Sequence, residues 1–522
     1  MKKLLLLLGL LLPLGLANAQ TLVYGQSGLP VTLDSAAAQD GNSLTVSQQI
    51  NETLVAHEPG GVKNIPGLAT EWSPNEDASV WTFQLREGVT FHDGTPFNAE
   101  AVKFNFDRWN DPAHPQSFRD QGNTYAGFEY VFGGFKGQGS ILDSVEVIDD
   151  HTVAFHLNKS VGYFPSMLSA SYLGLDSPTA VKKAGIDYGT PGVGAVGTGP
   201  FKFVEWNEGE QVVLQRYDDY WGKKAKVDTL VFRGIEDPTA RLAELQAGSI
   251  DIAVLLSPDD AATIKQNPNL KLVPTKGLNI GYLGLYQEGP LAKLKVRQAI
   301  AHAVDWDAVV DALYAGLGRR ADQMIPPEIW GRSDKVKAFD YDPELSKKLL
   351  AEAGYPNGFD TEFWYMPVSR PYFPVPQPIA STITSYLAEV GINAELKTED
   401  WGVYLSNYYT GKYPIYMLGW SPDYYDPDNY LFTWFGPGAT GQAGLGWDAP
   451  QVLQWLQDAR SAPTQEERAA LYAKVNQAVY EQIPTIPVAY SDVVNATQAN
   501  ISGYLPSPFG SSVPLNLVSK GQ

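Results

Sequence analysis

Apolar and polar residues alternate in several short stretches of the chain, a pattern with a period of two that predicts β-strands. Residues 81–85 and 89–91 alternate on either side of a Glu-Gly pair, so we expect them to form a hairpin. Residues 153–157 repeat the alternation. A second hairpin is expected from 201–204 and 212–214, which flank an Asn-Glu-Gly turn. The pattern therefore predicts antiparallel strands in the first half of the chain.

Helices are indicated by apolar stripes that follow capping residues. Asp342 precedes a proline and an apolar stripe that stops at Gly354, which predicts a helix with a defined beginning and end. Thr464 and Glu467 form a capping-box sequence before another stripe. Residues 296–313 are expected to form one continuous helix. Strands and helices alternate over 522 residues, which predicts an α/β fold with several domains.

The N-terminus has the features of a secretory signal. Lys2 and Lys3 precede an apolar run over 4–16, and residues 17–19 have the small-x-small pattern of a cleavage site. The run is shorter than the roughly 20 residues of a membrane span, which disfavours the alternative, a membrane anchor. We expect residues 1–19 to be removed, leaving Gln20 first and a net charge of −22 in place of −20. The mature protein is expected in a periplasm-like compartment.

Composition excludes several classes of function. A net charge of −20 argues against a nucleic-acid partner, because phosphates require a basic surface. The absence of Cys excludes disulfides, thiolate metal sites and Cys nucleophiles, and it excludes a lipid attached at an N-terminal cysteine. We therefore expect a free periplasmic protein rather than a lipoprotein, with no cofactor.

Catalytic motifs are mostly absent. Residues 192–197 match a dinucleotide fingerprint, but a proline precedes them and a predicted strand follows, where the fingerprint requires a helix. Residues 419–423 lack the second glycine of a nucleophile elbow. The six His are scattered and predict no metal site. A pair of glycosidase carboxylates remains compatible with the sequence, so a secreted hydrolase stays open as an alternative.

Aromatic residues are concentrated between 401 and 435. This stretch has about three times the aromatic content of the whole chain, which is 12%. Three acidic residues, Asp423, Asp426 and Asp428, lie within it. One interpretation is an aromatic core with acidic loops. The other is a ligand site with flat walls and fixed charges, suited to an ammonium-bearing or polyhydroxylated ligand. The 13 aromatics are Trp401, Tyr404, Tyr408, Tyr409, Tyr413, Tyr416, Trp420, Tyr424, Tyr425, Tyr430, Phe432, Trp434 and Phe435.

Motifs in a fixed order along the mature chain resemble the family-5 extracellular solute-binding proteins. These are the oligopeptide, dipeptide and nickel receptors of ABC importers, and the dipeptide branch is the most similar. The motifs are Gly67-Leu68-Ala69-Thr70-Glu71-Trp72, the stretch 81–94, Gly197-Thr198-Gly199-Pro200-Phe201, Tyr217-Asp218-Asp219-Tyr220-Trp221-Gly222, the stretch 296–305, the stretch 349–355, and Gly419-Trp420-Ser421-Pro422-Asp423 with Asp426-Pro427-Asp428-Asn429.

The resemblance implies a two-lobed periplasmic binding protein (type II-like, class C) with an extra domain beside the first lobe. Domain I, the first lobe, is expected to be discontinuous, with segments 20–45, 177–276 and 487–522. Domain II, the extra domain, is expected at 46–176. Domain III, the second lobe, is expected at 277–486. A two-stranded hinge would join the lobes.

The resemblance also implies a function without catalysis. A ligand binds between the lobes and favours the closed form, which then docks on a membrane permease driven by a separate ATPase. The protein is expected to be a monomer. Asp423 is expected to bind the ligand's α-ammonium group, and main-chain groups near Gly419 and Ser421 its backbone. Trp401 and Trp420 match pocket aromatics of the family, and Gln39, Asp40 and Gly41 match the wall of the first lobe.

One departure from the family pattern concerns the ligand's carboxylate. The dipeptide branch is expected to carry an Arg after the Arg-Pro-Tyr stretch, but this chain has none at 375–378. Loss of a bidentate Arg would weaken selection for dipeptides by length. Arg370 is an alternative partner for the carboxylate. Longer peptides, or an oligosaccharide or another small solute bound by the same fold, are alternative ligands.

Overall fold

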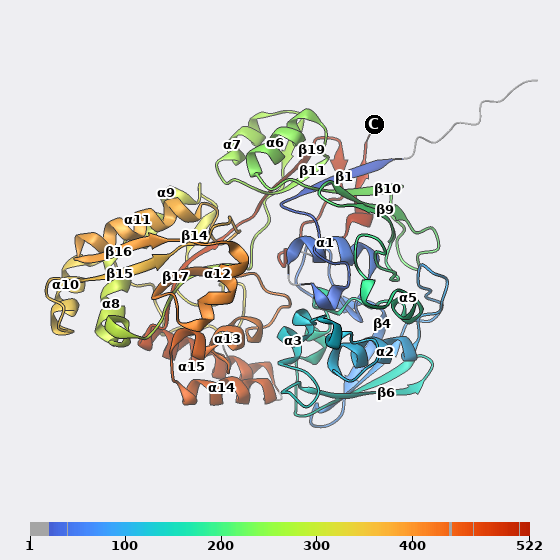
Figure 1. Cartoon of the computed structure of the whole chain (residues 1–522), viewed down its shortest axis with the longest axis horizontal. Coiled ribbons are helices and arrows are strands. Elements are labelled where there is room, and N and C mark those ends of the chain that lie inside the picture. Colours follow the sequence, from blue (N-terminus) through green and yellow to red (C-terminus); the bar gives the residue numbers. More distant parts are fainter. Residues whose placement is uncertain (1–19, 39, 438–440, 463, 511, 522) are drawn as a thin grey trace, which may run out of the picture.

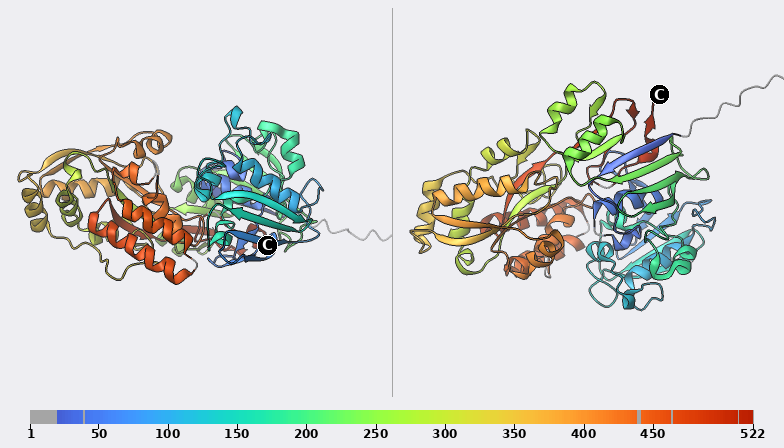
Figure 2. Two further views of the ribbon diagram at one scale, coloured as in Figure 1. Left: turned by 90° about the horizontal axis from the view of Figure 1, so that it is seen from below. Right: turned by 45° about the horizontal axis from the view of Figure 1, so that its top comes forward.

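The computed structural model describes residues 20–38, 40–437, 441–462, 464–510 and 512–521. The predicted signal peptide at 1–19, and Gln39 of the predicted site, lie outside these described residues. Two masses lie side by side (Figures 1 and 2). The mixed α/β architecture confirms the predicted fold class.

The first lobe is built on a seven-stranded sheet that gathers strands from three parts of the sequence. The N-terminal strand pairs in parallel with one strand on each side, and the C-terminal part of the chain contributes another strand. Helices α1 (Gly41–Ile50), α5 (Pro178–Ala184), α6 (Pro238–Ala247) and α7 (Asp260–Gln266) belong to this lobe. The strand order is β12 (Leu270–Leu272), β19 (Val494–Gln498), β11 (Ile252–Leu256), β1 (Thr21–Gln26), β10 (Thr229–Gly234), β9 (Gln211–Arg216) and β8 (Phe201–Asn207).

A four-stranded antiparallel sheet lies beside it in the same lobe. Its inner face carries Phe83 and Phe155, which pack with Phe106 of α2 in a core rich in edge-to-face aromatic contacts. The strand order is β4 (Ala69–Pro74), β5 (Val80–Leu85), β7 (Thr152–Leu157) and β6 (Leu142–Asp149). Helices α2 (Ala99–Asn110), α3 (Ala126–Phe132) and α4 (Phe164–Met167) and the ribbon β2 (Val55–His57) with β3 (Asn64–Pro66) complete this part.

The second lobe is built on a six-stranded sheet, and its core is the largest cluster of buried side chains in the described chain. The central strands β13 and β18 are buried along their whole length, so both faces of the sheet are covered. The strand order is β14 (Gly318–Arg320), β18 (Thr485–Ser491), β13 (Ile280–Leu285), β17 (Ile415–Trp420), β15 (Phe359–Trp364) and β16 (Ile392–Lys397). The helices are α8 (Leu294–Ala303), α9 (Trp306–Leu313), α10 (Pro343–Glu352), α11 (Pro376–Glu389), α12 (Trp401–Asn407), α13 (Asp428–Phe435), α14 (Pro450–Ser461) and α15 (Gln465–Gln482).

Two antiparallel segments connect the lobes. The chain leaves the first lobe at 273–279 and returns at 491–494. The Thr275 amide donates to the Val493 carbonyl at 3.0 Å, and the Val493 amide donates back at 2.8 Å. The Asn279 amide group donates to the Ser491 carbonyl at 2.9 Å, and the Ser491 amide donates to Asn279 at 3.2 Å. These paired segments form the two-stranded connection that the family resemblance implies.

Two expectations from the sequence pattern are wrong. Residues 89–91 do not pair with β5, which lies instead between β4 and β7; Phe91 is buried beside a turn closed by the Phe91 amide and the Thr95 carbonyl at 2.8 Å. The helix expected over 296–313 is split into α8 and α9, because the Asp305 carboxylate accepts the Ala308 amide at 2.9 Å and caps a new helix.

The other predicted elements are confirmed. β8 and β9 form the hairpin expected near 201–214, and β7 covers the stretch 153–157. Helix α10 begins at the Asp342 cap, whose carboxylate accepts the Leu345 amide at 2.8 Å. Helix α15 begins at Thr464, whose hydroxyl accepts the Glu467 amide at 3.2 Å. In each case a capping side chain satisfies a free amide of the first turn.

Candidate functional site

Asp423 follows β17 and lies where the two lobes meet. Asn429, in the first turn of α13, holds this segment with three hydrogen bonds. Its side-chain oxygen accepts the Asp423 amide at 2.8 Å and the Trp420 indole N–H at 3.0 Å, and its amide nitrogen donates to the Asp423 carboxylate at 3.2 Å. The carboxylate is therefore fixed in orientation by its own lobe.

The first lobe contributes Tyr172 to the same carboxylate. The Tyr172 hydroxyl donates a hydrogen bond to Asp423. The Asp423 side chain is partly buried, and this burial raises the pKa of its carboxyl to about 6. The hydrogen bonds from Asn429 and Tyr172 act in the opposite direction. Within the described ranges, no Lys or Arg forms a salt bridge with Asp423. A carboxylate in such surroundings favours a cationic partner.

His57 and Phe509 form the neighbouring wall of the first lobe. Their rings stack with centroids 4.2 Å apart. The His57 ring lies against the main chain of Asp423, and burial lowers the pKa of its imidazole to about 4. His57 is therefore neutral at physiological pH. Phe509 also packs against the core of the second lobe, so this wall spans the junction of the lobes.

Among the described strands, the end of β17 is paired on one side only. Gly419 pairs with Gly281 of β13 on one side, while pairing with β15 on the other side ends at Tyr416. The Tyr372 ring packs over Gly419, and a Cβ atom at Gly419 would lie 2.2 Å from it. Only glycine fits this position, and among the described residues no strand pairs with the adjoining main chain through Ser421 on the β15 side.

Trp401 and Arg370 lie together on the second lobe. Trp401 is the first residue of α12, whose N-cap Asp400 accepts the Gly402 amide at 3.0 Å. The Arg370 guanidinium lies over the Trp401 ring, 5.1 Å from its centroid, and donates to the Tyr372 hydroxyl. Arg370 is half-buried and forms no salt bridge with any carboxylate in the part of the chain that is described.

Of the predicted wall at 39–41, the two described residues lie at the start of α1. The Asp40 carboxylate caps α1, accepting the Ser43 amide at 2.9 Å and its hydroxyl at 2.6 Å, and Gly41 is exposed at the start of that helix. Contacts to Asp423 from the first lobe come from Tyr172 and His57. Asn429 binds both Asp423 and Trp420. Further along the second lobe, Tyr372 packs over Gly419 and contacts Arg370, which lies over Trp401.

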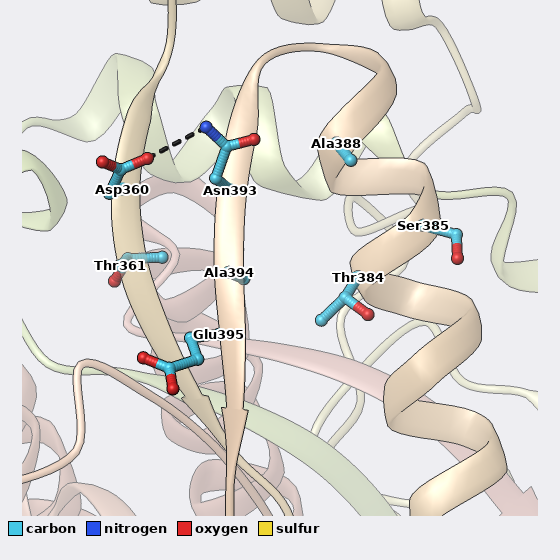
Figure 3. A pocket seen from close by; sticks show the side chains of 8 residues that line it. All are labelled: Asp360, Thr361, Thr384, Ser385, Ala388, Asn393, Ala394 and Glu395. Carbon is cyan, nitrogen blue, oxygen red and sulfur yellow. Dashed lines mark hydrogen bonds between the residues drawn. The ribbon is translucent and has the colours of Figure 1, made fainter.

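A separate pocket lies on the outer edge of the second lobe (Figure 3). It is an open hollow between β15, the edge strand β16 and α11, where the Asn393 side chain donates to Asp360 at 2.9 Å. None of the predicted ligand residues lines it. Across the described residues, no cluster of three His, Asp or Glu is arranged to hold a metal ion, and no helix is long and apolar enough to cross a bilayer.

Comparison with known proteins gives relatives over nearly the whole chain. The dipeptide-binding protein of Escherichia coli K12 is 35% identical over 509 residues, covering 94% of this chain and 93% of its own. Heme-binding protein A of Haemophilus influenzae is 36% identical over 506 residues, covering 95% and 91%. The fold matches an ABC transporter-associated periplasmic binding protein of Helicobacter pylori, solved with the peptide STSA, with a TM-score of 0.85, 30% identity and coverage of 96% and 98%.

The family profile agrees with these relatives. Residues 63–442 match the bacterial extracellular solute-binding proteins, family 5 Middle. This match confirms the resemblance drawn from the ordered motifs, and it favours a binding protein over the hydrolase alternative. The chain belongs to the family-5 bacterial extracellular solute-binding proteins.

Proposed function

We propose that the protein captures short peptides between its lobes and delivers them to an ABC importer. The observation that carries this proposal is the Asp423 carboxylate, which lies at the junction of the lobes and is in salt-bridge contact with no Lys or Arg of the described chain. A peptide's α-ammonium group supplies the missing positive charge through a charge-assisted hydrogen bond. The dipeptide-binding relative and the peptide-bound neighbour support this assignment.

The peptide backbone would add to the free edge of β17. The main chain from Gly419 to Ser421 continues past the last residue paired with β15, so its polar groups can pair with an extended ligand. Such pairing reads no side chains, which suits a receptor for peptides of varied sequence. Trp420, fixed by Asn429, and Trp401 supply flat surfaces beside this edge.

Arg370 is the proposed partner of the ligand's carboxylate. It is a half-buried cation held over Trp401, without a carboxylate partner among the described residues. Its contact with Tyr372, which packs over Gly419, links it to the β17 edge. Asp423 and Arg370 would then bind the two ends of a zwitterionic peptide, compensating for the missing Arg at 375–378.

The cellular role follows from the family. Family-5 receptors are periplasmic, and we propose that residues 1–19 direct export and are cleaved before Gln20. The partner would be a membrane permease, with the receptor acting as a monomer that binds no nucleic acid. The intact mass of protein secreted by an expression host should be that of a chain starting at Gln20, with or without loss of ammonia from this glutamine; a mass that includes residues 1–19 would contradict the cleavage.

We also propose the domain division expected from the resemblance with one boundary moved: segments 20–45, 177–276 and 492–522 form domain I, 46–176 domain II and 277–491 domain III, because β18 belongs to the second-lobe sheet. The separate sheets support this division. Because β18 extends to Ser491 within the second-lobe sheet, we place the return crossing at 491–494.

A ligand screen tests the proposed function. Native mass spectrometry of the purified protein should reveal bound peptides, and thermal shifts should grow with the concentration of added di- to tetrapeptides, including STSA. Oligosaccharides and heme are the comparison probes. Stabilisation by oligosaccharide or heme, with none by any peptide, would contradict peptide capture and favour another solute.

Proton release should accompany peptide binding at mildly acidic pH. The pKa of Asp423 is about 6 without a cation, so at pH 5 its carboxyl is mostly protonated, and the α-ammonium group requires the ionised form. Affinity should therefore rise between about pH 4 and 6 and level off above that range. The pKa of this carboxyl rises from its ordinary value of 3.8 to about 6 in the folded protein, so the folded state binds the proton more tightly than the unfolded chain. This contribution to stability is present below pH 3.8 and is lost as the pH rises from 3.8 through about 6.

Calorimetry at pH 5 in two buffers of unlike ionisation enthalpy measures this linkage. Release approaching one proton per peptide is expected, and it should disappear at pH 8. His57, with a pKa of about 4, stays neutral over most of this range. Equal heats in both buffers at pH 5 would show that Asp423 is not the ammonium site.

A further inference from the structure

Directly after Asp423, the second lobe inserts a side chain into the first. Tyr424 is 1% exposed and belongs to the buried cluster formed by the four-stranded sheet and its helices. Its hydroxyl donates to the Asp428 carboxylate at 3.3 Å. Tyr424 therefore forms a contact between the two lobes directly beside Asp423, the residue proposed to bind ligand. This contact requires the lobes to be closed.

Two buried ion pairs of the second lobe support this segment. Arg468 of α15 donates to both oxygens of Asp426 at 2.8 and 2.6 Å, and Arg460 of α14 donates to both oxygens of Asp428 at 2.8 and 2.7 Å. Each pair lies within one lobe, so opening the lobes breaks neither of them. They form a rigid, preformed surface that faces the first lobe.

Tyr163 of the first lobe covers this surface. The Arg468 guanidinium lies 4.1 Å from the centroid of the Tyr163 ring, and Tyr163 is 4% exposed. Its segment is anchored by the Trp81 indole, which donates to the Val161 carbonyl at 3.1 Å. A cation–π contact is stronger when it is shielded from water, as here. Opening the lobes would expose both partners and lose the contact.

We propose that Tyr163, seated on Arg468 beside Tyr424, is a positioning residue that stabilises the closed form and thereby sets the affinity for all ligands by one common factor. This proposal rests on the proposed function for the ligand, but the contact itself lies outside the residues assigned to bind it. Ligands bind tightly only to the closed form. A contact that stabilises this form therefore increases the affinity for every ligand by the same factor.

The test uses Tyr163→Leu, which keeps an apolar side chain in the first-lobe core and removes the ring, with Tyr163→Phe as the matched control. Because the chain has no Cys, spin labels can be attached at two introduced cysteines, replacing exposed Asp143 of β6 and Gln457 of α14. Without ligand, the leucine variant should show longer interlobe distances than wild type. Its affinity for STSA and for a dipeptide should fall by the same factor, about tenfold. The phenylalanine variant keeps the ring over Arg468 and loses the hydroxyl that interacts with Asp428, so it should lie between wild type and the leucine variant in both measurements.

Unchanged affinity for both peptides in a folded Tyr163→Leu variant, verified by near-ultraviolet circular dichroism, would overturn the proposal. A loss confined to one of the two peptides would also overturn it, because it would show that Tyr163 touches ligand. If wild type binds no peptide while the distances still lengthen in the leucine variant, peptide capture fails and the closure contact stands.

Discussion

Replacing Asp423 by Asn should reduce the affinity for peptides with a free α-ammonium group by at least about a hundredfold. The asparagine keeps the shape of the side chain and removes its charge. The ligand's ammonium group would then be buried against neutral partners, and truncating one side of a buried, hydrogen-bonded charge pair costs roughly 2–5 kcal/mol. Asn429 and Tyr172 hold position 423 in both proteins, so the fold should be preserved.

Isothermal titration with a dipeptide and with its N-acetylated form measures this effect. Wild type should prefer the free amine strongly, and Asp423→Asn should bind both forms with similar, weak affinity. Asp448→Asn, a change at an exposed aspartate of the same lobe, is the matched control and should bind like wild type. Undiminished affinity of Asp423→Asn for the free amine would remove this residue from the site.

Replacing Arg370 by Gln should lower the affinity for peptides with a free C-terminal carboxylate by tenfold or more, the second largest effect expected. A guanidinium presents two parallel donors to a carboxylate, whereas glutamine presents one neutral amide. Because Arg370 has no carboxylate partner among the described residues, its removal leaves no buried charge uncompensated in the protein itself. The cost should therefore appear in binding and hardly in stability.

The comparison of peptide acids with peptide amides isolates this contact. Wild type should discriminate against the C-terminal amide, and Arg370→Gln should not. Arg370→Lys should lie between the two, since it keeps the charge and loses the fork. If Arg370→Gln still prefers the acid by the wild-type factor, the carboxylate binds elsewhere and the length of the ligand is not set by this residue.

Capping residues predicted where helices begin. Some elements whose structure depends on contacts between distant segments were not predicted correctly. Asp342 and Thr464 each satisfy an amide three residues on, so their helices could be read directly. The helix break at Asp305 carried the same signal, an aspartate three residues before Ala308, but the long apolar stripe concealed it. Residues 89–91 alternate like a strand, but they pair only locally: Thr90 forms a bridge with Pro96, and Phe91 is buried beside the turn.

The sequence predicted the second-lobe part of the candidate site but not the contacts that Tyr172 and His57 of the first lobe make with Asp423. Asp423 and Trp420 stood out within the aromatic stretch, and the motif that contains them also contains Asn429, which orients both. Tyr172 and His57 lie more than 250 residues away along the chain and carry no motif, so only folding brings them to Asp423. Asp40 stays a predicted residue of the first-lobe wall, and the structure adds that its carboxylate caps α1.

A crystal structure of the protein with a free-amine dipeptide tests the central claim most directly. The account predicts the peptide between the two lobes, with its α-ammonium nitrogen about 2.7–3.2 Å from the Asp423 carboxylate and its backbone along the end of β17. A peptide bound on an outer surface, or one held between the lobes with its ammonium group away from Asp423, would contradict it.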